Sequence, residues 1–357
     1  MCFIPKPNIF RSLHIGSWNI NGLGDKSDDD DFLNIVHKYD ILILTETWLA
    51  GSDCIDIPGY YVYSHSRNKP SQVNRNYGGI AVLVKVHLRK YVKVIDVDSN
   101  FHVWLKLCMN VGLDNDLYIG CVYIPPATSS FYKSNPTLDP YQELNDKVVK
   151  YQSIGDVLIT GDFNARTSSL NDFLKNDNDE YLPVRGDLDF YNADSNDTLR
   201  CNSDKNVNSF GKKILQVCKE NSLRILNGRI IGDLLGNYTC TRYNGKSVVD
   251  YAILSKCLLS KITYFRVIPD EEITDTALSD HSPILLNLEV RQNIVKYDKK
   301  LSSNRCQNGF LWKSDSQEKY KETLKLPIIQ NEINKIMTDE TPPPNQEGVD
   351  IFCKLVS

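Results

Sequence analysis

Three apolar stretches of the sequence end in side chains that can bind a metal ion or a phosphate. The first stretch leads into Asn19, the second into Glu46, and the third into Asp162, with Asn164 just after it. Open β-sheets place their ligands at the carboxyl ends of strands. A single carboxylate at such a position is commonly a helix cap or a turn former. Its recurrence at several strand ends favours one shared site.

A further carboxylate, Asp250, lies inside an apolar stretch, where an unpaired charge would be costly. We therefore expect a cationic partner. His281 is the natural candidate because it comes immediately before the apolar run at 284–290. The remaining histidines have no comparable setting and are predicted to be structural or surface residues: His14, His37, His65, His87 and His102.

The candidate ligands are mostly hard oxygen atoms. Carboxylates come from Glu46, Asp162 and Asp280, and amides come from Asn19 and Asn164. Such a set suits Mg²⁺, with Mn²⁺ as an alternative, better than zinc, which would require a cluster of cysteine and histidine. A nucleophilic serine is disfavoured because the sequence has no Gly-x-Ser-x-Gly turn to expose one.

The elements that must hold these residues are mainly strands. Short apolar runs, rich in Val, Ile and Tyr and bounded by Gly, Asn, Asp or Pro, predict strands at 13–20, 41–44, 79–86, 103–109, 117–123, 157–160, 223–226, 248–254, 262–268 and 284–290. Helical spacing predicts helices at 31–39, 141–152 and 212–221. Some strands are apolar on both faces and others alternate. We therefore predict an α/β (α+β) fold of two packed sheets with helices outside.

Length and charge bound the possibilities. The 357 residues fit one large domain with a tail or two ordinary domains. A formal charge of -4 argues against a protein that holds nucleic acid mainly through a basic surface. However, residues 170–206 carry nine acidic and four basic residues, which predicts a long, mobile surface loop and leaves the rest of the chain nearly neutral. Net charge therefore excludes only a broadly basic binder.

The pattern along the chain predicts one domain with two flanking segments. Apolar periodicity begins near residue 12 and fades beyond about residue 291, after which a run of three prolines appears. We predict an N-terminal extension at 1–11, the domain at 12–291, and a tail or linker at 292–357 that is partly helical or disordered.

The sequence also indicates an intracellular protein, nuclear or cytoplasmic. Prolines and a lysine interrupt residues 1–7, where a signal peptide would need an unbroken apolar stretch. No run approaches the length of a membrane span. The ten cysteines are scattered without a Cys-x-x-Cys pair and are predicted to be reduced thiols. We therefore expect neither secretion nor a membrane partner.

Six motifs occur in the order and approximate spacing of the endonuclease/exonuclease/phosphatase superfamily. They are Trp18-Asn19-Ile20-Asn21-Gly22-Leu23, Thr45-Glu46-Thr47-Trp48, Gly161-Asp162-Phe163-Asn164, Tyr238-Thr239-Cys240, Val249-Asp250-Tyr251 and Ser279-Asp280-His281. Within this superfamily, residues 12–290 most resemble the endonuclease domain of non-LTR retrotransposons, which is similar to apurinic endonucleases. The resemblance implies a four-layer sandwich in which two mixed β-sheets are flanked by helices.

The resemblance also implies a role for each matching residue. Glu46 resembles the principal Mg²⁺ ligand, with Asn19 and Asp280 beside it through direct or water-mediated contacts. Asp162 resembles the carboxylate that orients or deprotonates the attacking water. Asn164 would steady both that carboxylate and the phosphate.

A second group of matching residues would act on the phosphate and the DNA. His281, oriented by Asp250, resembles the pair that contacts the scissile phosphate. Tyr123 matches a tyrosine that touches the phosphate or supports the leaving group. Thr239 falls at a substrate contact, and Ser279 accompanies the pair as a further substrate-binding residue. Because Asp250 should raise the pKa of His281, this histidine is expected to act either as a base or as an electrostatic clamp.

Together these matches imply a Mg²⁺-dependent endonuclease that nicks DNA, with a reverse transcriptase region as a partner absent from this chain. The first alternative is an abasic-site repair endonuclease or another phosphoesterase of the superfamily. It is disfavoured because Thr45 and Trp48 stand where apurinic endonucleases usually have Gln and Lys. The second alternative is an inactive DNA-binding module, against which the complete set of motif residues argues.

Overall fold

The computed structural model describes residues 10–50, 55–66, 78–174, 199–269, 272 and 278–291. All of them belong to the first of two units, residues 1–295, and the second unit is 296–357. The predicted tail at 292–357 and all but the end of the predicted extension at 1–11 lie outside the described residues. Within the described part of the chain, every helix is too short or too polar to span a membrane.

The described strands form two six-stranded sheets and a two-stranded hairpin. The first sheet contains β1 (Phe10–Asn19), β2 (Ile41–Thr45), β3 (Tyr60–His65), β4 (Ile80–Lys85), β13 (Ile262–Val267) and β14 (Ile284–Arg291). The second contains β5 (Val92–Asp96), β6 (His102–Leu107), β7 (Leu117–Tyr123), β8 (Asp156–Asp162), β9 (Leu223–Ile225) and β12 (Asp250–Ser255). Their spatial orders are β13-β14-β1-β2-β4-β3 and β5-β6-β7-β8-β12-β9. The hairpin is β10 (Cys240–Arg242) with β11 (Gly245–Ser247).

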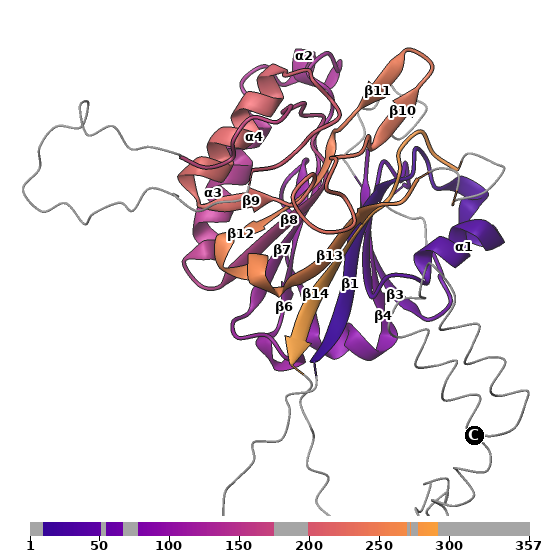
Figure 1. Cartoon of the computed structure of the whole chain (residues 1–357). Coiled ribbons are helices and arrows are strands. Elements are labelled where there is room, and N and C mark those ends of the chain that lie inside the picture. The colour runs from indigo at the N-terminus through magenta and orange to yellow at the C-terminus, as the bar shows by residue number, and fades with distance from the viewer. Residues whose placement is uncertain are drawn as a thin grey trace, which may run out of the picture. The chain divides into compact units, whose positions relative to one another are not determined.

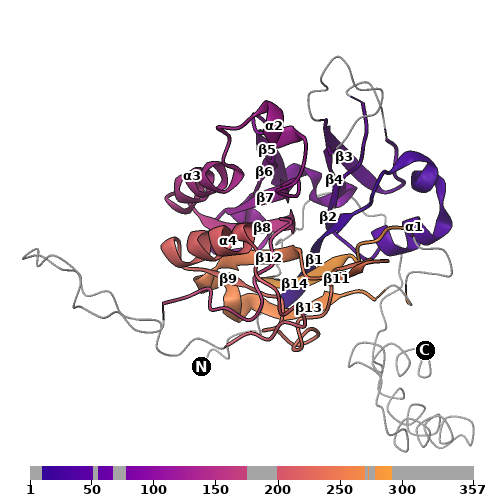
Figure 2. The same ribbon diagram turned by 90° about the horizontal axis from the view of Figure 1, so that it is seen from above.

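The two sheets pack face to face with helices on the outside, as Figures 1 and 2 show. The helix α1 (Asp30–Val36) covers the first sheet, and α3 (Pro140–Gln152) and α4 (Ser209–Glu220) cover the second, beside the one-turn α2 (Phe131–Ser134). Short 3₁₀ helices span Gly24–Asp28, Val86–Tyr91, Met109–Val111 and Lys256–Lys261. The predicted four-layer sandwich of two mixed sheets and flanking helices is confirmed.

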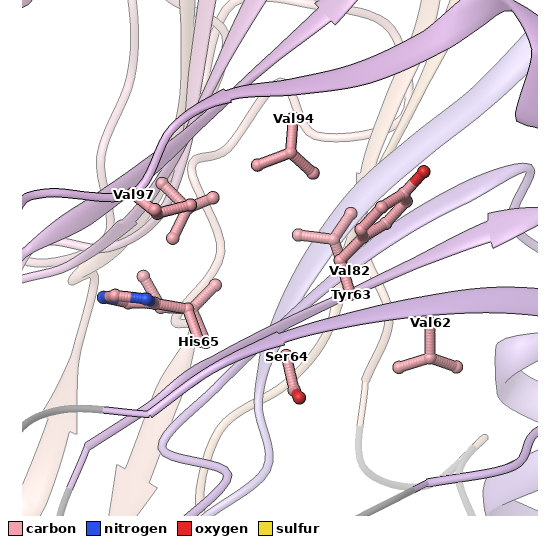
Figure 3. Close-up of a pocket in the computed structure, with 9 residues that line it drawn as sticks. Val62, Tyr63, Ser64, His65, Val82, Val94 and Val97 are labelled. Atoms are coloured by element: carbon pink, nitrogen blue, oxygen red, sulfur yellow. The ribbon is translucent and has the colours of Figure 1, made fainter. Parts of the chain in front are cut away.

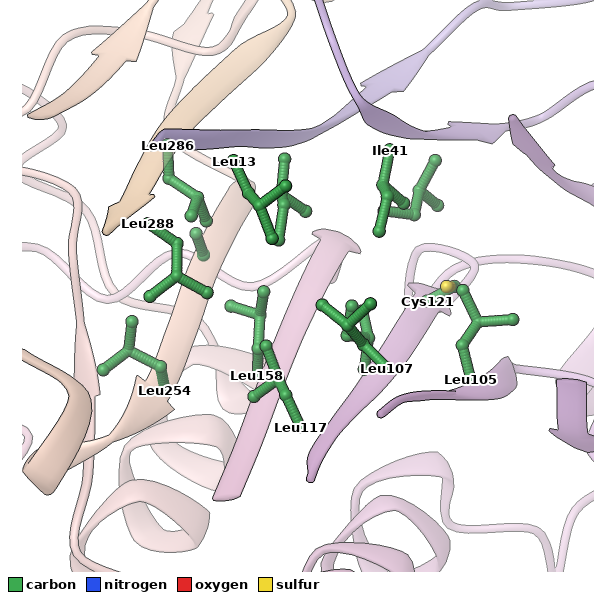
Figure 4. Packing of buried hydrophobic residues seen from close by; sticks show 14 of the residues in the cluster. Leu13, Ile41, Leu105, Leu107, Leu117, Cys121, Leu158, Leu254, Leu286 and Leu288 are labelled. Carbon is green, nitrogen blue, oxygen red and sulfur yellow. The ribbon is translucent and has the colours of Figure 1, made fainter. Parts of the chain in front are cut away.

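Side chains alternate between the two faces of each sheet, which explains why several strands are apolar throughout. In β2, Ile41 and Ile43 pack in the core between the sheets, whereas Leu42 and Leu44 pack beneath α1. Figure 4 shows the central core, to which strands of both sheets contribute. Burying one such side chain contributes about 1.5–3 kcal/mol.

Capping side chains define where the helices begin. Asp139 accepts hydrogen bonds from the backbone N–H groups that open α3, and Pro140 occupies the first turn. Asp29 and Asn208 accept equivalent bonds at the starts of α1 and α4. The three helices predicted from apolar spacing are therefore confirmed, with shifts of a few residues at their ends.

The acidic segment at 170–206 differs from the mobile surface loop that its composition predicts. Residues 175–198 lie outside the described part of the chain, but side chains on both sides of them are buried. Asp172 pairs with Arg229 across 2.7 Å, and Asp204 pairs with Arg166 across 2.7 Å. Because these charges are paired within the fold, the prediction of a solvated loop is wrong for the two ends of the segment.

A cavity of about 330 Å³ lies among the strands β3 to β6 (Figure 3). Its lining is largely apolar and consists of Val62, Tyr63, Ser64, His65, Ile80, Val82, Val94, Val97 and Val103. None of the predicted site residues lines this cavity, so the chemistry lies elsewhere, at the strand ends.

Candidate active site

Strand register brings the predicted residues to one edge of the sandwich. β1 and β2 are parallel and in register, so Asn19 ends one strand and Glu46 directly follows the other. β7 and β8 are also parallel, with Tyr123 beside Asp162, and β12 begins at Asp250 opposite Asp162. Because parallel strands end at the same edge of a sheet, these side chains gather there.

Two buried hydrogen bonds join the sheets at this edge. Ser17 Oγ and Thr160 Oγ1 lie 3.1 Å apart. Further along the same strands, Asn19 Nδ2 donates to Asp162 Oδ2 at 2.9 Å. The same nitrogen donates to Glu46 Oε1 at 3.0 Å. Asn19 therefore holds two carboxylates, one from each sheet, against a single amide group.

The backbone turns sharply at two of the site residues. Glu46 has a φ of 51° and Asn164 a φ of 47°, in the left-handed region that L-amino acids rarely adopt. At Asn164 this turn lets the backbone N–H donate to Asp162 Oδ1 at 2.8 Å and the side-chain amide donate to Asp162 Oδ2 at 3.1 Å. Both oxygen atoms of Asp162 are thus fixed, at the cost of local strain of the kind found at functional sites.

Asp250 and His281 form the pair expected from the sequence. Asp250 Oδ2 lies 2.8 Å from His281 Nδ1, and each residue is only 2% exposed. Burial lowers the pKa of His281, but the charge of Asp250 and its hydrogen bond outweigh burial and hold that pKa well above its usual value. The pairing with Asp250 therefore favours the charged form of the imidazole.

Thr239 supports this pair through the backbone of the segment that carries Asp250. Its hydroxyl oxygen accepts hydrogen bonds from the backbone N–H groups of Val249 at 3.0 Å and Asp250 at 3.1 Å. The residue is 0% exposed, so its side chain presents no surface to a substrate. The sequence match placed Thr239 at a substrate contact, whereas the structure places it where it fixes the start of β12.

Ser279 ties the segment that carries His281 to the end of β1. Its hydroxyl donates to the carbonyl oxygen of Asn19 at 2.6 Å and accepts from His281 N at 3.1 Å. Trp18 Nε1 adds a buried bond to the carbonyl oxygen of His281 at 2.7 Å. The substrate contact predicted for Ser279 stays a prediction, since these bonds give its hydroxyl a positioning role.

The electrostatics of the site centre on Asp162. Burial is the largest influence and, together with the charges of Asp250 and Glu46, raises the pKa of Asp162 to about 7, although His281 opposes the rise. A carboxylate with a pKa near neutrality is suited to accept a proton at neutral pH. Tyr123 lies next to it at the end of β7 and is mostly buried in the central core. The role predicted for Tyr123 at the phosphate stays a prediction.

Asp280 has a carboxylate oxygen that fits a divalent cation, and Glu46 offers a second carboxylate at the end of β2. Asp280 Oδ2 accepts from Arg242 Nε at 2.6 Å, while Asp280 Oδ1 is buried and lacks a hydrogen-bond partner among the described residues. Glu46 is half-buried, and its Oε1 accepts a hydrogen bond from the side-chain amide of Asn19. A buried carboxylate oxygen without a partner is costly, and a cation would satisfy it. The donor atoms are oxygen, as Mg²⁺ and Mn²⁺ prefer.

A second group of potential ligands is less suited to a metal. Ligand atoms of Asp162, Asp250 and His281 lie within 4.8 Å of one another. A charged imidazole carries protons on both nitrogens and has no lone pair for a metal ion. We therefore regard His281 as the cation of this group, balancing the two carboxylates.

Comparison with known proteins agrees with this geometry. Residues 16–281 match the sequence profile described as the Endonuclease/Exonuclease/phosphatase family. The chain belongs to this family. Membership identifies it as an enzyme of the class that hydrolyses phosphodiester bonds, and it confirms the resemblance inferred from the six motifs.

Two relatives come from fly mobile elements. Over 117 residues, or 32% of this chain, the sequence is 33% identical to the "Probable RNA-directed DNA polymerase from transposon BS" of Drosophila melanogaster. It is 32% identical, again over 117 residues, to the "RNA-directed DNA polymerase from mobile element jockey" of the same species. Each match covers 12% of the relative, so the chain spans only a small part of either protein.

Two solved structures align with this chain, and the first, with a TM-score above 0.5, shares its fold. An AP endonuclease from Leishmania major aligns with a TM-score of 0.53 and 14% identity, covering 79% of this chain and 89% of that one. The endonuclease domain of TRAS1, a telomere-specific non-LTR retrotransposon, aligns with a TM-score of 0.48 and 15% identity, covering 79% of this chain and 100% of that one.

The structure adds residues that sequence reasoning missed in this family member. Arg242 reaches Asp280 only because the hairpin strand β10 lies beside the segment that carries His281. Ser17 and Thr160 join the sheets just before Asn19 and Asp162. The alternation of side chains along β1 and β8 could have suggested Ser17 and Thr160, but β10 is too short to give a pattern.

Proposed function

We propose that the chain is a Mg²⁺-dependent endonuclease that nicks DNA by attack of water on a phosphodiester. The observation that carries the proposal is the Asn19 amide that joins Glu46 to Asp162, beside the pair of Asp250 and His281. Carboxylates for a metal and a base, next to a buried cation for the phosphate, are what in-line hydrolysis requires. Family membership supports the reaction class.

Glu46 and Asp280 would hold the metal ion, with Asn19 beside them. Mn²⁺ could replace Mg²⁺ because both ions prefer oxygen ligands. When bound, the ion supplies Lewis-acid stabilisation of the charge that develops on the phosphate oxygens. Asn19 itself acts by alignment, since its amide nitrogen already binds Glu46 and Asp162.

Asp162 orients the attacking water and accepts its proton. The water oxygen bonds to phosphorus, the bond from phosphorus to the 3′ oxygen breaks, and the proton of the water passes to the carboxylate. The departing 3′ oxygen takes a proton from solvent and becomes the 3′ hydroxyl. A pKa of about 7 leaves Asp162 able to act as a base near neutral pH. Asn164 and Asn19 keep the carboxylate in place by donating to its two oxygen atoms.

His281 supplies positive charge to the scissile phosphate. Asp250 binds Nδ1, which orients the ring, so that Nε2 would be the nitrogen that donates to a phosphate oxygen. Tyr123 supports the departing 3′ oxygen. Ser279 and Thr239 act as positioning residues, one through the backbone of His281 and the other through the backbone of Asp250.

The substrate that we propose is duplex DNA, and the partner is a reverse transcriptase region absent from this chain. Both fly relatives are named RNA-directed DNA polymerases of mobile elements. A nick that leaves a 3′ hydroxyl would give such a polymerase a primer.

Cleavage of a labelled duplex oligonucleotide tests this function. With Mg²⁺, the full chain should nick one strand, and a DNA polymerase should extend the new end, because the end is a 3′ hydroxyl. A parallel duplex with one abasic site separates the proposal from a repair activity. Strong preference for the abasic strand, with the intact duplex left uncut, would replace retrotransposon-type nicking with abasic-site cleavage.

A further inference from the structure

The position of Arg242 is set by backbone contacts to the segment that carries the active-site histidine. Cys240 and His281 form an isolated β-bridge. The backbone N–H of Thr241 donates to the carbonyl oxygen of Asp280 at 2.8 Å. The main chain therefore holds Arg242, the next residue of β10, beside Asp280, independently of any contact that the Arg242 side chain makes.

The guanidinium of Arg242 binds Asp280, one of the candidate metal ligands. Nε donates to Asp280 Oδ2 at 2.6 Å. Burial lowers the pKa of Arg242, but the hydrogen bond to Asp280 and the nearby charges, including that of Glu46, raise it overall. The arginine thus lies within electrostatic reach of Glu46 as well as Asp280.

In the ion pair between Arg242 and Asp280, another cation can replace the guanidinium. The two side chains are 53% and 25% exposed, and a half-exposed ion pair contributes little to stability. The other oxygen of the carboxylate, Asp280 Oδ1, is buried without a hydrogen-bond partner among the described residues. A cation that reached this oxygen would satisfy it and would also compete with Arg242 for the charge of Asp280.

We propose that Arg242 is a substrate-binding residue that Asp280 holds in reserve: a divalent cation that neutralises Asp280 releases the guanidinium to bind a DNA phosphate. The planar guanidinium suits this role because its N–H groups match two oxygen atoms of a phosphate. The cation thereby takes the place of the guanidinium at Asp280, and the released guanidinium binds the negatively charged substrate. This inference rests on the proposed function, and it concerns a residue that the motif matches do not include.

The proposal predicts opposite effects on metal and DNA. In the full chain, Arg242→Ala removes a competitor of the metal, so Mn²⁺ binding without DNA, followed by electron paramagnetic resonance, should tighten about two- to fivefold. The same change removes a charge-assisted contact with phosphate, so KM for nicking of a duplex in Mg²⁺ should rise about tenfold. Arg242→Lys keeps the charge without the paired N–H groups. Its Mn²⁺ affinity should stay near that of the native chain while KM rises by a smaller factor.

Lys246→Ala is the matched control, because Lys246 lies opposite Thr241 on the same hairpin and is exposed. It should leave Mn²⁺ affinity unchanged. Weaker or unchanged Mn²⁺ binding by Arg242→Ala would overturn the proposal, since an arginine that only braces the hairpin would not compete with the metal. If the native chain fails to nick with either Mg²⁺ or Mn²⁺, the proposed function fails. If the native chain nicks and Arg242→Ala matches it in both measurements, only this inference fails.

Discussion

Asp162 and Asp250 occupy directly opposite positions on the antiparallel strands β8 and β12, and both are buried. Like charges opposite each other in a sheet are destabilising, but His281 lies within 4.8 Å of both carboxylates and balances them. The site thus depends on register, because a slip of one residue would turn either side chain to the other face of the sheet.

The first prediction concerns the balance of charge between Asp250 and His281. Asp250→Asn keeps the shape of the side chain but removes the charge that orients and maintains the charged form of His281. Plasmid nicking in Mg²⁺ should slow by on the order of 10²-fold or more. Asp156→Asn, at the opposite end of β8, serves as the control and should nick at the native rate. Native activity in Asp250→Asn would show that the pair has no part in the reaction.

Thr239 separates a positioning role from a substrate contact. Thr239→Val leaves the buried N–H groups of Val249 and Asp250 without their acceptor, which should lower the free energy of unfolding by about 2 kcal/mol. Thr239→Ser keeps the hydroxyl and should remain close to native. Urea denaturation measures both variants. Unchanged stability in Thr239→Val together with weaker DNA binding would instead favour the substrate contact that the sequence match implies.

Asp172 should be important for stability although it lies in the acidic segment and is not one of the candidate site residues. Its carboxylate receives two N–H groups of Arg229, at 2.7 and 2.8 Å, and the backbone N–H of Ile225 at 2.7 Å. Asp172→Asn removes the negative charge that balances the buried guanidinium of Arg229 and should cost about 3–5 kcal/mol. Asp114→Asn, in an exposed ion pair, should leave the denaturation midpoint nearly unchanged. Equal effects of the two changes would contradict this account.

His102 should make stability depend on pH. Trp104 Nε1 donates to His102 Nδ1 at 3.2 Å, so the ring proton lies on Nε2, which faces Glu143 across 3.5 Å. Burial, and then the charge of Lys147, lowers the pKa of His102 from 6.5 to about 4. Between pH 6.5 and about pH 4, His102 therefore binds a proton in the unfolded chain but stays neutral in the folded chain.

The contribution of His102 to stability is therefore complete above pH 6.5 and is lost as the pH falls toward 4. The total loss is on the order of 3 kcal/mol. His102→Asn removes the titrating group, so the difference in unfolding free energy between variant and native chain should shrink across this window. Parallel pH profiles of the two proteins would show that His102 does not titrate there.

Much of the fold was predictable from the sequence because strands buried on both faces are apolar throughout. β2 is such a strand, with every residue buried. The missed strands are of two kinds. β3 and β5 are sheet edges with partly exposed side chains, and the hairpin strands β10 and β11 have three residues each. Neither kind leaves a clear apolar pattern.

The site was predictable in its residue types but not in all its contacts. Recurrence of polar side chains at strand ends indicated Asn19, Glu46 and Asp162, and the cost of a buried charge indicated the partner of Asp250. The burial of Thr239 depends on how the hairpin packs against the chain near His281, about 40 residues away in the sequence. Local sequence patterns carry no information about such pairing.

The most direct test of the central claim is the conversion of supercoiled plasmid to the nicked form by the full chain, with Mg²⁺ or with a chelator. We predict nicking in Mg²⁺ and none in the chelator. We also expect Glu46→Gln to slow the reaction by on the order of 10²-fold or more, while Glu220→Gln, at the exposed end of α4, nicks like the native chain. Full activity in Glu46→Gln, or DNA binding without cleavage in both Mg²⁺ and Mn²⁺, would contradict the proposed function.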